Sequence, residues 1–560
     1  MEKKKRGSAT SVKEVVLGNL GLSSLDDINN WFRKSYADEY RVDFLNEAAV
    51  MILDGKWDGI YVCGDYDVDG ITATAQLKIV LSALNLPVNC RIPRRFSEGF
   101  GLSPSIIQEI PDGKNLIVTV DNGIAALEAV SLAKERGFSV IVTDHHLPQV
   151  EAGKTILPDA DIIIDPNAIP GSADFNGYCG SGLAFKLMKA LLKEMTKRNP
   201  EEKGYKSLVA AIEPLAMLGT ICDVMELREE NYVFVRNGLA KLNRGIAPIG
   251  LLALAERMWL KDITSEDVAF MIGPALNANG RLSDDGAVKS MTLLSTTNKA
   301  EAKALAELSV GNNNLRKQQV ENAVAFATMT IKAQKLENTM PMILYIPQVN
   351  EGIIGIVAGR LSESFGNITM VFTDAEGGLL KGSGRAAEGL NIKKVLDEMP
   401  ELFAAYGGHE GAAGMTIDKD EFAEFKVRSR QVVEGFGWTP VKSSDIQYDL
   451  EVENKDVPAV LEELVKYAPF GHGNPVPVFK VKNFEIAPGP DMHMYTEVGK
   501  QGIKLYSAFA QAVGFSMRQE VKDRGDVVLD LFGTLSYNRF KGQSTPQISF
   551  LEFDARNAVI

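Results

Sequence analysis

The sequence contains little of what marks several specialised classes of protein. It has only four cysteines in 560 residues, which lie far apart and form no CxxC pair, so we expect neither a disulfide framework nor a zinc knuckle. Its longest apolar stretch, residues 245–255, is much shorter than the ~18 residues that span a bilayer. These absences favour a soluble, cytoplasmic protein with no membrane partner.

Excess positive charge is also absent. Lys and Arg together number 60 and Asp and Glu number 73, which gives a formal net charge of −13. This balance argues against a histone-like protein that coats nucleic acid through bulk charge. A nucleic-acid enzyme remains open, because carboxylates that hold metal ions count as negative charges until the ions are bound.

The amino terminus lacks a targeting signal. Its first ten residues, MEKKKRGSAT, are basic, but no apolar segment follows them, so they do not form a signal peptide. We expect these ten residues to be a solvated tail, and residues 1–44 as a whole to form this tail and a helical segment.

Length and hydrophobic periodicity predict three or four domains, the first of them α/β. In the first third of the chain, β-branched runs alternate with helical segments, which indicates a parallel sheet covered on both faces. Ligands bind such sheets at the carboxyl ends of the strands. The predicted strands are 59–63, 88–93, 116–120, 139–143 and 161–164, and the predicted helices are 71–84, 124–136 and 182–197.

The rest of the chain predicts a connecting helix and two further units. Residues 299–336 read as a long helix that Gly311 and its Asn run could interrupt. A strand at 342–346 opens a second α/β unit that reaches about residue 437. The last ~120 residues are rich in strands, which indicates a small barrel or sandwich. The strands predicted there are 443–450, 476–481, 505–515, 526–537 and 547–553.

Acidic or imidazole side chains stand at the ends of three predicted strands and of one later apolar segment. A single aspartate at such a place is usually a helix cap or a turn residue, and GDYDVDG lacks the glutamate that an EF-hand needs. The conjunction of four motifs needs another explanation. The residues are Asp65, Asp67 and Asp69 in GDYDVDG, Asp121 in VDNG, Asp144, His145 and His146 in TDHH, and Asp223 in GTICDV.

Electrostatics indicates what these side chains could do together. Two carboxylates ~4 Å apart repel by about 4 kcal/mol at an effective dielectric constant of 20. Several that converge would exhaust the stability margin of a domain unless cations hold them. Oxygen ligands mixed with imidazole suit manganese or magnesium better than structural zinc. We therefore predict a binuclear hydrolytic centre that generates hydroxide and clamps a phosphoryl group.

In this order the four motifs resemble those of the DHH phosphoesterases. The similarity continues through IGPALNANGRL (272–282), GIIGIVAGRL (352–361), GSGRA (382–386), GGHEGAAG (407–414) and PFGHGNPVPVF (469–479), a series similar to that of the RecJ single-strand-specific 5′-to-3′ exonucleases. It covers the chain from about residue 45. The resemblance implies a DHH domain at 45–298, a linker helix at 299–338, a DHH-associated domain at 339–437 and an OB-like domain at 438–560.

The resemblance also implies roles for individual residues. Two divalent cations, with manganese the first choice and magnesium the alternative, would be held by Asp65, Asp67, Asp69, Asp121, His145 and Asp223. Asp121 would bridge the two metals. His146 would lie near the scissile phosphate, and Asp144 would orient His145. The 5′ end would be recognised by Arg95, Ser383 and Arg385, and the DNA backbone would be contacted by Arg281 and His409.

Elementary chemistry agrees with the DNA contacts, because arginine offers a planar fork to phosphate oxygens. We assign His472 to structure, since turn residues surround it. The chain departs from the family pattern at Glu226, Ala275 and Asn350, none of which is an expected metal ligand. An active but divergent enzyme is therefore expected.

We expect the protein to degrade single-stranded DNA from 5′ to 3′, releasing 5′-mononucleotides in recombination and repair. It would act as a monomer, with a single-strand-binding protein and a helicase as further partners. Two alternatives stay open. A phosphoesterase for short oligonucleotides or small phosphate substrates would end near residue 437, and an inactive DNA-binding scaffold would have lost acidic ligands.

The strand-rich region at 438–560 is expected to extend the single-strand path by base stacking. YNRFKG (537–542) has polar and turn residues around its rings, which predicts an exposed loop. Tyr506 is expected in the core instead. The candidate stacking and cationic residues are Tyr495, Tyr537, Phe540, Arg539 and Lys541.

Overall fold

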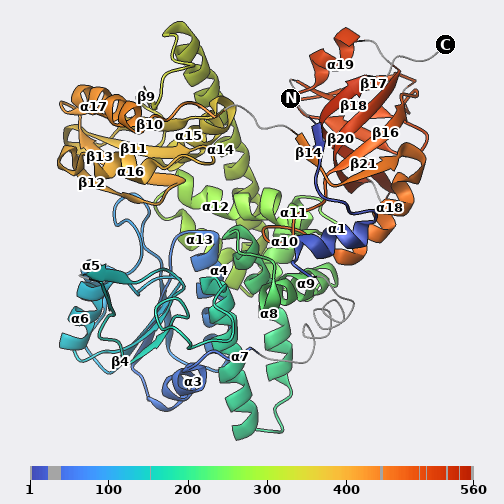
Figure 1. Cartoon of the computed structure of the whole chain (residues 1–560). Coiled ribbons are helices and arrows are strands. Elements are labelled where there is room, and N and C mark those ends of the chain that lie inside the picture. Colours follow the sequence, from blue (N-terminus) through green and yellow to red (C-terminus); the bar gives the residue numbers. More distant parts are fainter. Residues whose placement is uncertain are drawn as a thin grey trace.

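The computed structural model describes residues 3–22, 40–151, 153–441, 446–490, 492–499, 501–524, 527–540 and 543–555. Figure 1 shows a parallel sheet with its helices, a layer of further helices, a second sheet above them, and a β-rich domain at one side. Residues 23–39 of the expected segment 1–44, residues 443–445 of the predicted strand 443–450, residue 526 of the predicted strand 526–537, and Lys541 lie outside the described residues.

The first sheet is parallel throughout, and this confirms the predicted α/β class. Its strand order is β3-β2-β4-β5-β8. Cys63 of β2 pairs with Thr119 of β4, and Val120 pairs with Thr143 of β5, so these three strands end at the same edge. The strands are β2 (Gly59–Cys63), β3 (Val88–Arg91), β4 (Asn115–Val120), β5 (Ser139–Thr143) and β8 (Ile162–Ile164).

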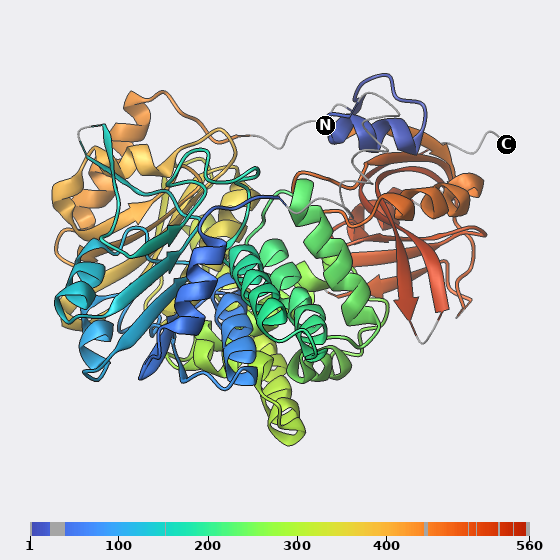
Figure 2. The same cartoon turned by 90° about the horizontal axis from the view of Figure 1, so that it is seen from below.

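Helices cover both faces of this sheet, as Figure 2 shows. Leu116, Val118 and Val120 of β4 pack into one core with helices α3, α4 and α7, whereas Ile117 packs with α5 and α6 on the opposite face. This alternation explains why β4 is apolar at nearly every position. The helices are α3 (Leu45–Asp54), α4 (Val68–Ala83) and α7 (Gly180–Arg198) on one face, and α5 (Pro104–Glu109) and α6 (Leu127–Glu135) on the other. A small hairpin, β6 (Gln149–Glu151) and β7 (Lys154–Ile156), follows β5.

A helical layer continues from the sheet to the second domain. It consists of α8 (Gly204–Cys222), α9 (Glu229–Asn243), α10 (Ile249–Arg257), α11 (Ser265–Asp267), a π-helix (Val268–Ile272), α12 (Gly273–Leu282), α13 (Gly286–Ser295) and α14 (Lys299–Ala333). Among the helices that the structure describes, α8 alone is long and apolar enough to cross a membrane. It packs against α4, α7 and α9, with over half of its apolar stretch buried inside the fold.

The expected interruption of the connecting helix near Gly311 is wrong, because α14 is continuous over 35 residues. The adjacent asparagines bond to side chains instead of breaking the helix. Asn312 donates to Asn279 Oδ1 at 2.8 Å, and Asn313 Oδ1 accepts from Arg316 at 2.7 Å. Polar residues that favour turns in isolation are therefore satisfied here within the helical layer.

The second sheet has the order β12-β13-β11-β10-β9, with β9 parallel to β10 and the other pairs antiparallel. Helices α14 and α15 pack on one face of it, and α16 and α17 on the other. The elements are β9 (Met342–Tyr345), α15 (Glu351–Phe365), β10 (Ile368–Asp374), β11 (Leu379–Ala386), α16 (Ile392–Asp397), β12 (Phe403–Gly408), β13 (Ala412–Asp418) and α17 (Phe422–Gly435).

The carboxyl-terminal domain is a mixed sheet in the order β15-β16-β20-β21-β19-β18-β17. Its elements are β14 (Ile446–Tyr448), β15 (Leu450–Glu453), α18 (Val457–Leu464), β16 (Phe479–Glu485), β17 (Tyr495–Val498), β18 (Gly502–Tyr506), β19 (Gln511–Gly514), α19 (Arg518–Arg524), β20 (Val528–Phe540) and β21 (Gln543–Ala555). The expected exposed loop is wrong for residues 537–540, because β20 pairs with β21 as far as Phe540. Tyr537 packs against the core of the domain.

The expected solvated tail is also wrong. Residues Lys3–Lys5 form β1, which pairs in parallel with β14. Val12–Asn19 form α1, which lies beyond the ten-residue tail, in the segment 1–44 where a helical part is expected. Val12, Val15 and Val16 of α1 join the core of the carboxyl-terminal domain. Figure 2 shows α1 lying against that domain, far from the sheet that follows it in sequence. The apolar face of VKEVVLGN therefore packs this segment onto the domain, although the residues before it are basic.

Candidate active site

The loop after β2 carries the first acidic cluster. Asp67 caps α4 by accepting a hydrogen bond from Gly70 N at 3.1 Å, and Asp65 Oδ1 accepts from Gly101 N at 3.3 Å. A Cβ at Gly70 would lie 2.5 Å from Asp65 N, so only glycine permits this compact turn. The turn directs Asp65, Asp67 and the following Asp69 of α4 toward the carboxyl ends of the strands.

Asp121 directly follows β4 in a left-handed conformation, with φ of 62°. Its backbone N–H donates to Thr143 O at 3.1 Å, which ties it to the end of β5. A Cβ at Gly180 would lie 2.4 Å from Asp121 Cβ, so α7 approaches this residue with its bare backbone. A left-handed aspartate is uncommon, and such strain concentrates at functional sites.

The structure brings the candidate ligands from four segments into one cluster. His145 Nε2 lies 3.1 Å from Asp121 Oδ1, 3.6 Å from Asp223 Oδ2 and 3.8 Å from Asp69 Oδ2. Asp223 reaches the cluster as the C-cap of α8. Three overlapping groups could each hold a metal ion, with ligand atoms within 4.8 Å of one another. The groups are Asp65–Asp67–Asp121, Asp69–His145–Asp223 and Asp121–His145–His146.

Asp144 holds the two histidines differently from what the sequence predicts. Its Oδ1 lies 2.7 Å from His146 Nδ1, whereas it reaches His145 only through the backbone N–H, at 2.8 Å. Its Oδ2 accepts from Ile124 N at 2.9 Å. Asp144 therefore orients the ring of His146, and the ring of His145 faces Asp121.

Burial and mutual repulsion make this cluster a poor place for uncompensated negative charge. Burial, with the charge of Asp67, raises the pKa of Asp65 to about 7. Burial, with the charge of Asp69, raises the pKa of Asp223 to about 8, and the pKa of Asp121 also lies well above its usual value. Carboxyl groups with pKa values raised in this way are stabilised by binding protons or cations.

The pKa values of the two histidines shift in opposite directions. Burial lowers the pKa of His145, so its ring is neutral and able to ligate a metal. Burial also opposes the charging of His146, but the hydrogen bond and charge of Asp144 outweigh it and raise its pKa to about 9. In the metal-free protein His146 is therefore protonated at neutral pH and suited to contact a phosphate.

These pKa values predict how metal removal affects stability. In EDTA, we expect the free energy of unfolding to fall as the pH rises from ~4 to about 8. Asp65 and Asp223 ionise near pH ~4 when unfolded but only near about 7 and about 8 when folded, so the folded state binds more protons across this window. Saturating Mn²⁺ should remove the loss.

Differential scanning calorimetry at pH 5, 6, 7 and 8, with EDTA or Mn²⁺, measures this effect. Asp223→Asn serves as the control, since its apo protein should show a shallower loss of stability with pH. A thermal midpoint in EDTA that is constant or rises over this range would contradict the arrangement of charges described above.

A second cluster, of arginines, lies between the parallel sheet and the second sheet. Burial and the charges of Arg95, Arg316 and Arg385 lower the pKa of Arg281 to about 10, so each of these three guanidinium groups lies near that of Arg281. Among the residues that the structure describes, none of the four forms an ion pair with a carboxylate. Cations gathered without acidic partners indicate a site for a polyanion.

The expected end-binding residues lie in this arginine cluster. Arg385 Nη1 donates to Ser383 Oγ at 3.2 Å, and Arg95 stacks over the ring of Tyr66 with its guanidinium carbon 4.6 Å from the ring centre. Arg281 Nη1 donates to Gly352 O at 3.1 Å, which joins α12 to α15. His409 differs from these residues. It is exposed in the turn between β12 and β13, and in the described part of the chain it makes no contact with the arginines.

The sequence analysis missed two residues beside the clusters. Arg316 lies on α14, and its Nε is buried without a hydrogen-bond partner in the part of the chain that the structure describes. Phe100 is 55% exposed, and its ring lies 5.6 Å from that of His146 and 6.4 Å from that of Tyr66. The available signal for Arg316 is the Asn-rich run before it, from which the sequence predicts a helix interruption instead.

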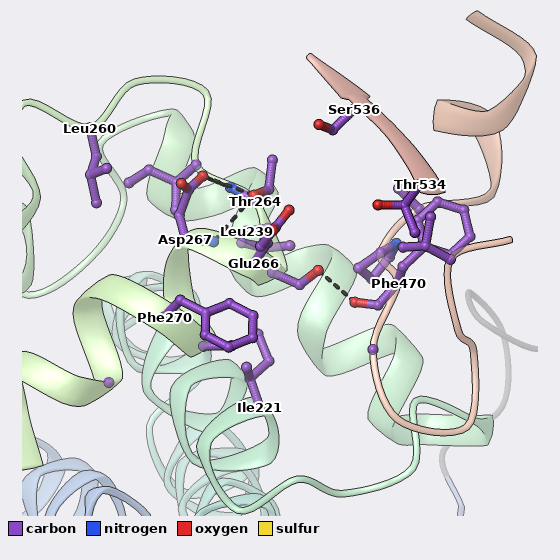
Figure 3. Close-up of a pocket in the computed structure, with 18 of the residues that line it drawn as sticks. Ile221, Leu239, Leu260, Thr264, Glu266, Asp267, Phe270, Phe470, Thr534 and Ser536 are labelled. Carbon is purple, nitrogen blue, oxygen red and sulfur yellow. Dashed lines mark hydrogen bonds between the residues drawn. The ribbon is translucent and has the colours of Figure 1, made fainter. Parts of the chain in front are cut away.

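A cavity of about 1190 Å³ separates the helical layer from the carboxyl-terminal domain. Figure 3 shows Phe270 of the π-helix pointing into it and Phe470, Thr534 and Ser536 on the opposite wall. Arg281 and Arg316 also line the cavity, so it meets the arginine cluster. Ser265 Oγ donates to Phe470 O at 2.6 Å, which joins the two walls.

The departures from the family pattern have structural explanations. Asn350 caps α15 by accepting from Gly352 N at 2.7 Å, and Ala275 is fully buried in α12. Glu226 lies against Gly473, where a Cβ would be 2.9 Å from Glu226 Cβ. His472 contacts this region through its backbone oxygen, which accepts from Leu227 N at 2.7 Å.

A parallel sheet whose strand ends gather carboxylates and imidazoles defines a DHH-type phosphoesterase. Family models agree: the DHH family N-terminal domain matches residues 59–220, the DHHA1 domain matches 340–435, and the RecJ OB domain matches 448–552. The chain belongs to the RecJ family. This confirms the predicted resemblance and the predicted order of α/β, α/β and OB-like units.

Individual relatives support the family assignment. The single-stranded-DNA-specific exonuclease RecJ of Salmonella typhimurium is 34% identical over 434 residues, which cover 75% of this chain and 74% of that protein. RecJ of Bacillus subtilis is 31% identical over 532 residues, covering 92% of this chain and 64% of that protein. The crystal structure of Thermus thermophilus RecJ in complex with Mn²⁺ is 26% identical, with a TM-score of 0.75, and covers 100% of this chain and 80% of that one. The same Thermus protein has also been solved with Mg²⁺.

Proposed function

We propose that this protein is a metal-dependent exonuclease that hydrolyses single-stranded DNA from its 5′ end and releases 5′-mononucleotides. The observation that carries the proposal is the pairing of two clusters. Carboxylates and imidazoles that need cations lie beside half-buried arginines that need anions, and a nucleic-acid backbone with bound metal ions satisfies both. Its RecJ relatives carry the name of this activity.

The residues divide the chemistry among themselves. Asp65, Asp67, Asp69, Asp121, His145 and Asp223 would hold two divalent cations, Mn²⁺ or Mg²⁺, which supply a hydroxide and neutralise the phosphoryl oxygens when bound. His146, kept protonated by Asp144, donates a hydrogen bond to the phosphate under attack or to the leaving oxygen. Burial of the cluster keeps these interactions strong.

The proposed direction of degradation is supported by the residues expected to bind the 5′ end. Arg95, Ser383 and Arg385 offer two cationic forks and a hydroxyl, which is the set expected around a terminal phosphate. A 5′-phosphate held there would present the first phosphodiester to the metal ligands. His409 remains a proposed backbone contact further along the strand.

Replacing Arg385 by alanine should separate end recognition from general binding. We expect the specificity constant for a 5′-phosphorylated oligonucleotide to fall about 10- to 100-fold, since hydrogen bonds to charged groups contribute ~1.5–3 kcal/mol. The constant for the 5′-hydroxyl oligonucleotide should change much less. Single-turnover assays on both substrates measure the difference.

Lys381→Ala is the matched control for this prediction, because Lys381 is an exposed cation on the same strand, β11. Equal losses on both substrates in Arg385→Ala would make this residue a general backbone contact.

The carboxyl-terminal domain and the cavity beside it support a polymer as the substrate. A small phosphate ester would need neither, whereas a strand leaving the arginine cluster through Arg281 and Arg316 would reach Phe270 and the sheet beyond. The inactive-scaffold alternative is disfavoured because every expected acidic ligand is present. We further propose that the protein acts as a cytoplasmic monomer in recombination and repair, with a helicase supplying single strands and a single-strand-binding protein presenting them.

One assay tests the function. The protein is incubated with 5′- or 3′-labelled single-stranded and duplex DNA in Mn²⁺, Mg²⁺ or EDTA, and the products are identified. We expect labelled mononucleotide at once from the 5′-labelled single strand, a progressively shortened 3′-labelled strand, and no reaction in EDTA. Rapid cleavage of blunt duplex DNA, or mononucleotides released first from the 3′ end, would contradict the proposal.

A further inference from the structure

A buried polar network lies beneath the candidate metal centre, where α4, α7 and α8 meet. Its members Thr72, Gln76 and Ser181 are fully buried, and none of them is a candidate metal ligand. Buried polar side chains cost stability unless their hydrogen bonds are satisfied, and they specify a unique arrangement when they are. We therefore ask what these buried hydrogen bonds hold in place.

The network begins at the carboxylate of Asp69, which is 2% exposed. Gly180 N donates to its Oδ2 at 2.7 Å, and Ser181 N donates to its Oδ1 at 2.9 Å. These are the first two amides of α7, which have no partner inside the helix and lie at its positive end. Each oxygen of Asp69 is thus fixed by one N–H and keeps a lone pair for a cation.

The side chain of Ser181 holds this arrangement from behind. Its Oγ accepts from Gln76 Nε2 at 2.8 Å, donates to Leu215 O at 3.1 Å, and lies 2.9 Å from Thr72 Oγ1. Asp69, Thr72 and Gln76 follow one another at i, i+3 and i+7, so they share the face of α4 that meets α7. One residue, Ser181, therefore joins three helices through its hydroxyl while its own amide holds Asp69.

Helix α8 approaches the same point with bare backbone. A Cβ at Gly219 would lie 2.3 Å from Ser181 Cβ and 2.4 Å from Asp69 Oδ1. Asp223, at the end of α8, is thereby held in register with Asp69. A shift of Ser181 would displace both carboxylates.

Stability alone does not explain Gln76. Its Oε1 is buried and has no hydrogen-bond partner among the described residues. An apolar side chain of the same length would avoid the cost of this unsatisfied oxygen. Gln76 Nε2 donates both to Ser181 Oγ and to Ser181 O, the latter at 3.0 Å. An apolar side chain could make neither hydrogen bond.

We propose that Ser181, Gln76 and Thr72 are positioning residues that fix the carboxylate of Asp69 for cation binding. This inference rests on the proposed metal site and adds three residues that bind neither metal nor DNA. They act by holding the first turn of α7 against α4, so that two amides orient both oxygens of Asp69.

The test measures Mn²⁺ binding to the full chain in the absence of DNA, by electron paramagnetic resonance of free Mn²⁺. We expect Ser181→Ala and Gln76→Leu to weaken the affinity for at least one Mn²⁺ about 10- to 100-fold, the usual effect of removing a residue that orients a ligand. Gln76→Leu should keep or raise the thermal midpoint measured in EDTA. A merely structural role predicts a lower midpoint instead.

Thr72 offers a matched pair of variants. Thr72→Val keeps the shape and removes the hydroxyl, whereas Thr72→Ser keeps the hydroxyl and removes a methyl group. Positioning predicts weaker Mn²⁺ binding in Thr72→Val and near-wild-type binding in Thr72→Ser, and a packing role predicts the reverse. Ser429→Ala is the control for loss of a buried serine hydroxyl, since Ser429 donates to Phe425 O in the second domain.

Unchanged Mn²⁺ affinity in Ser181→Ala and Gln76→Leu would overturn the proposal, as would equal losses in Ser429→Ala. Because metal binding is measured without DNA, the outcome is separate from the proposed activity. A wild-type protein that binds Mn²⁺ tightly but degrades no DNA would refute the proposed function and leave this inference standing.

Discussion

Replacing Asp223 by alanine should reduce hydrolysis of single-stranded DNA by at least ~10³-fold, which corresponds to ~4 kcal/mol in the barrier. Asp223 Oδ2 lies 3.6 Å from His145 Nε2, and Asp223 shares a candidate metal group with His145 and Asp69. Its loss would leave that group with two ligands. Steady-state assays over a range of Mn²⁺ concentrations check the effect, because excess metal should restore little of the rate.

The same substitution should not unfold the protein. The Asp223 side chain is 28% exposed, and the residue caps α8 through its backbone N–H, which donates to Gly219 O at 2.9 Å. Removing the side chain therefore keeps the cap and relieves repulsion among neighbouring carboxylates. We therefore expect the thermal midpoint in EDTA to stay equal or rise. Asp159→Ala, at an exposed carboxylate, is the control for both readouts. Near-wild-type turnover of Asp223→Ala would remove this residue from the metal site.

Removing the carboxyl-terminal domain together with the amino-terminal segment should weaken binding of a 30-mer about 30-fold or more. Stacked bases contribute ~1–3 kcal/mol each, so the loss of two stacked bases would account for it. The structure changes how this deletion must be made. Val12, Val15 and Val16 share their core with the carboxyl-terminal domain and with no described residue of 40–437, so the shortened chain should span 40–437.

This shortened chain should still hydrolyse very short oligonucleotides, because every proposed metal ligand lies within it. Fluorescence anisotropy at two salt concentrations separates stacking from phosphate contacts. A chain cut only after residue 437 would expose the apolar face of α1 and is the less informative comparison. Phe515→Ala in the full chain, which removes a 67% exposed ring from the wall of the cavity, should weaken binding by a smaller factor. Unchanged affinity of the folded 40–437 chain would refute the role of the domain.

Local sequence was sufficient for the elements that carry the chemistry. Strands β2 and β5 begin and end where the β-branched runs at 59–63 and 139–143 do, because parallel strands buried on both faces must be apolar throughout. The residues after such strands gather at one edge of a sheet, so the motifs already indicated which side chains would converge. The glycines in GDYDVDG allow the loop to close, and the contacts that require glycine there are made within the same loop.

Other features depend on residues that are far apart in the chain. The basic amino terminus becomes a strand because β14, more than 400 residues away, offers it a free edge. Gly311 does not break α14, since Asn279 of α12 donates to Ser309 Oγ and accepts from Asn312 on either side of it. Arg316 joins the arginine cluster only when the folded chain brings Arg95, Arg281 and Arg385 near it.

The sequence by itself determined the class of fold, the order of its units and the acidic and imidazole groups, since these follow from periodicity and from motifs within a few residues. The tertiary structure alone decided how those groups are held. The amides of α7 on Asp69, the hydroxyl of Ser181 between three helices and the docking of α1 on the distant domain are contacts between segments that no local pattern links. Their energies depend on close packing and burial, and these exist only once the chain has folded.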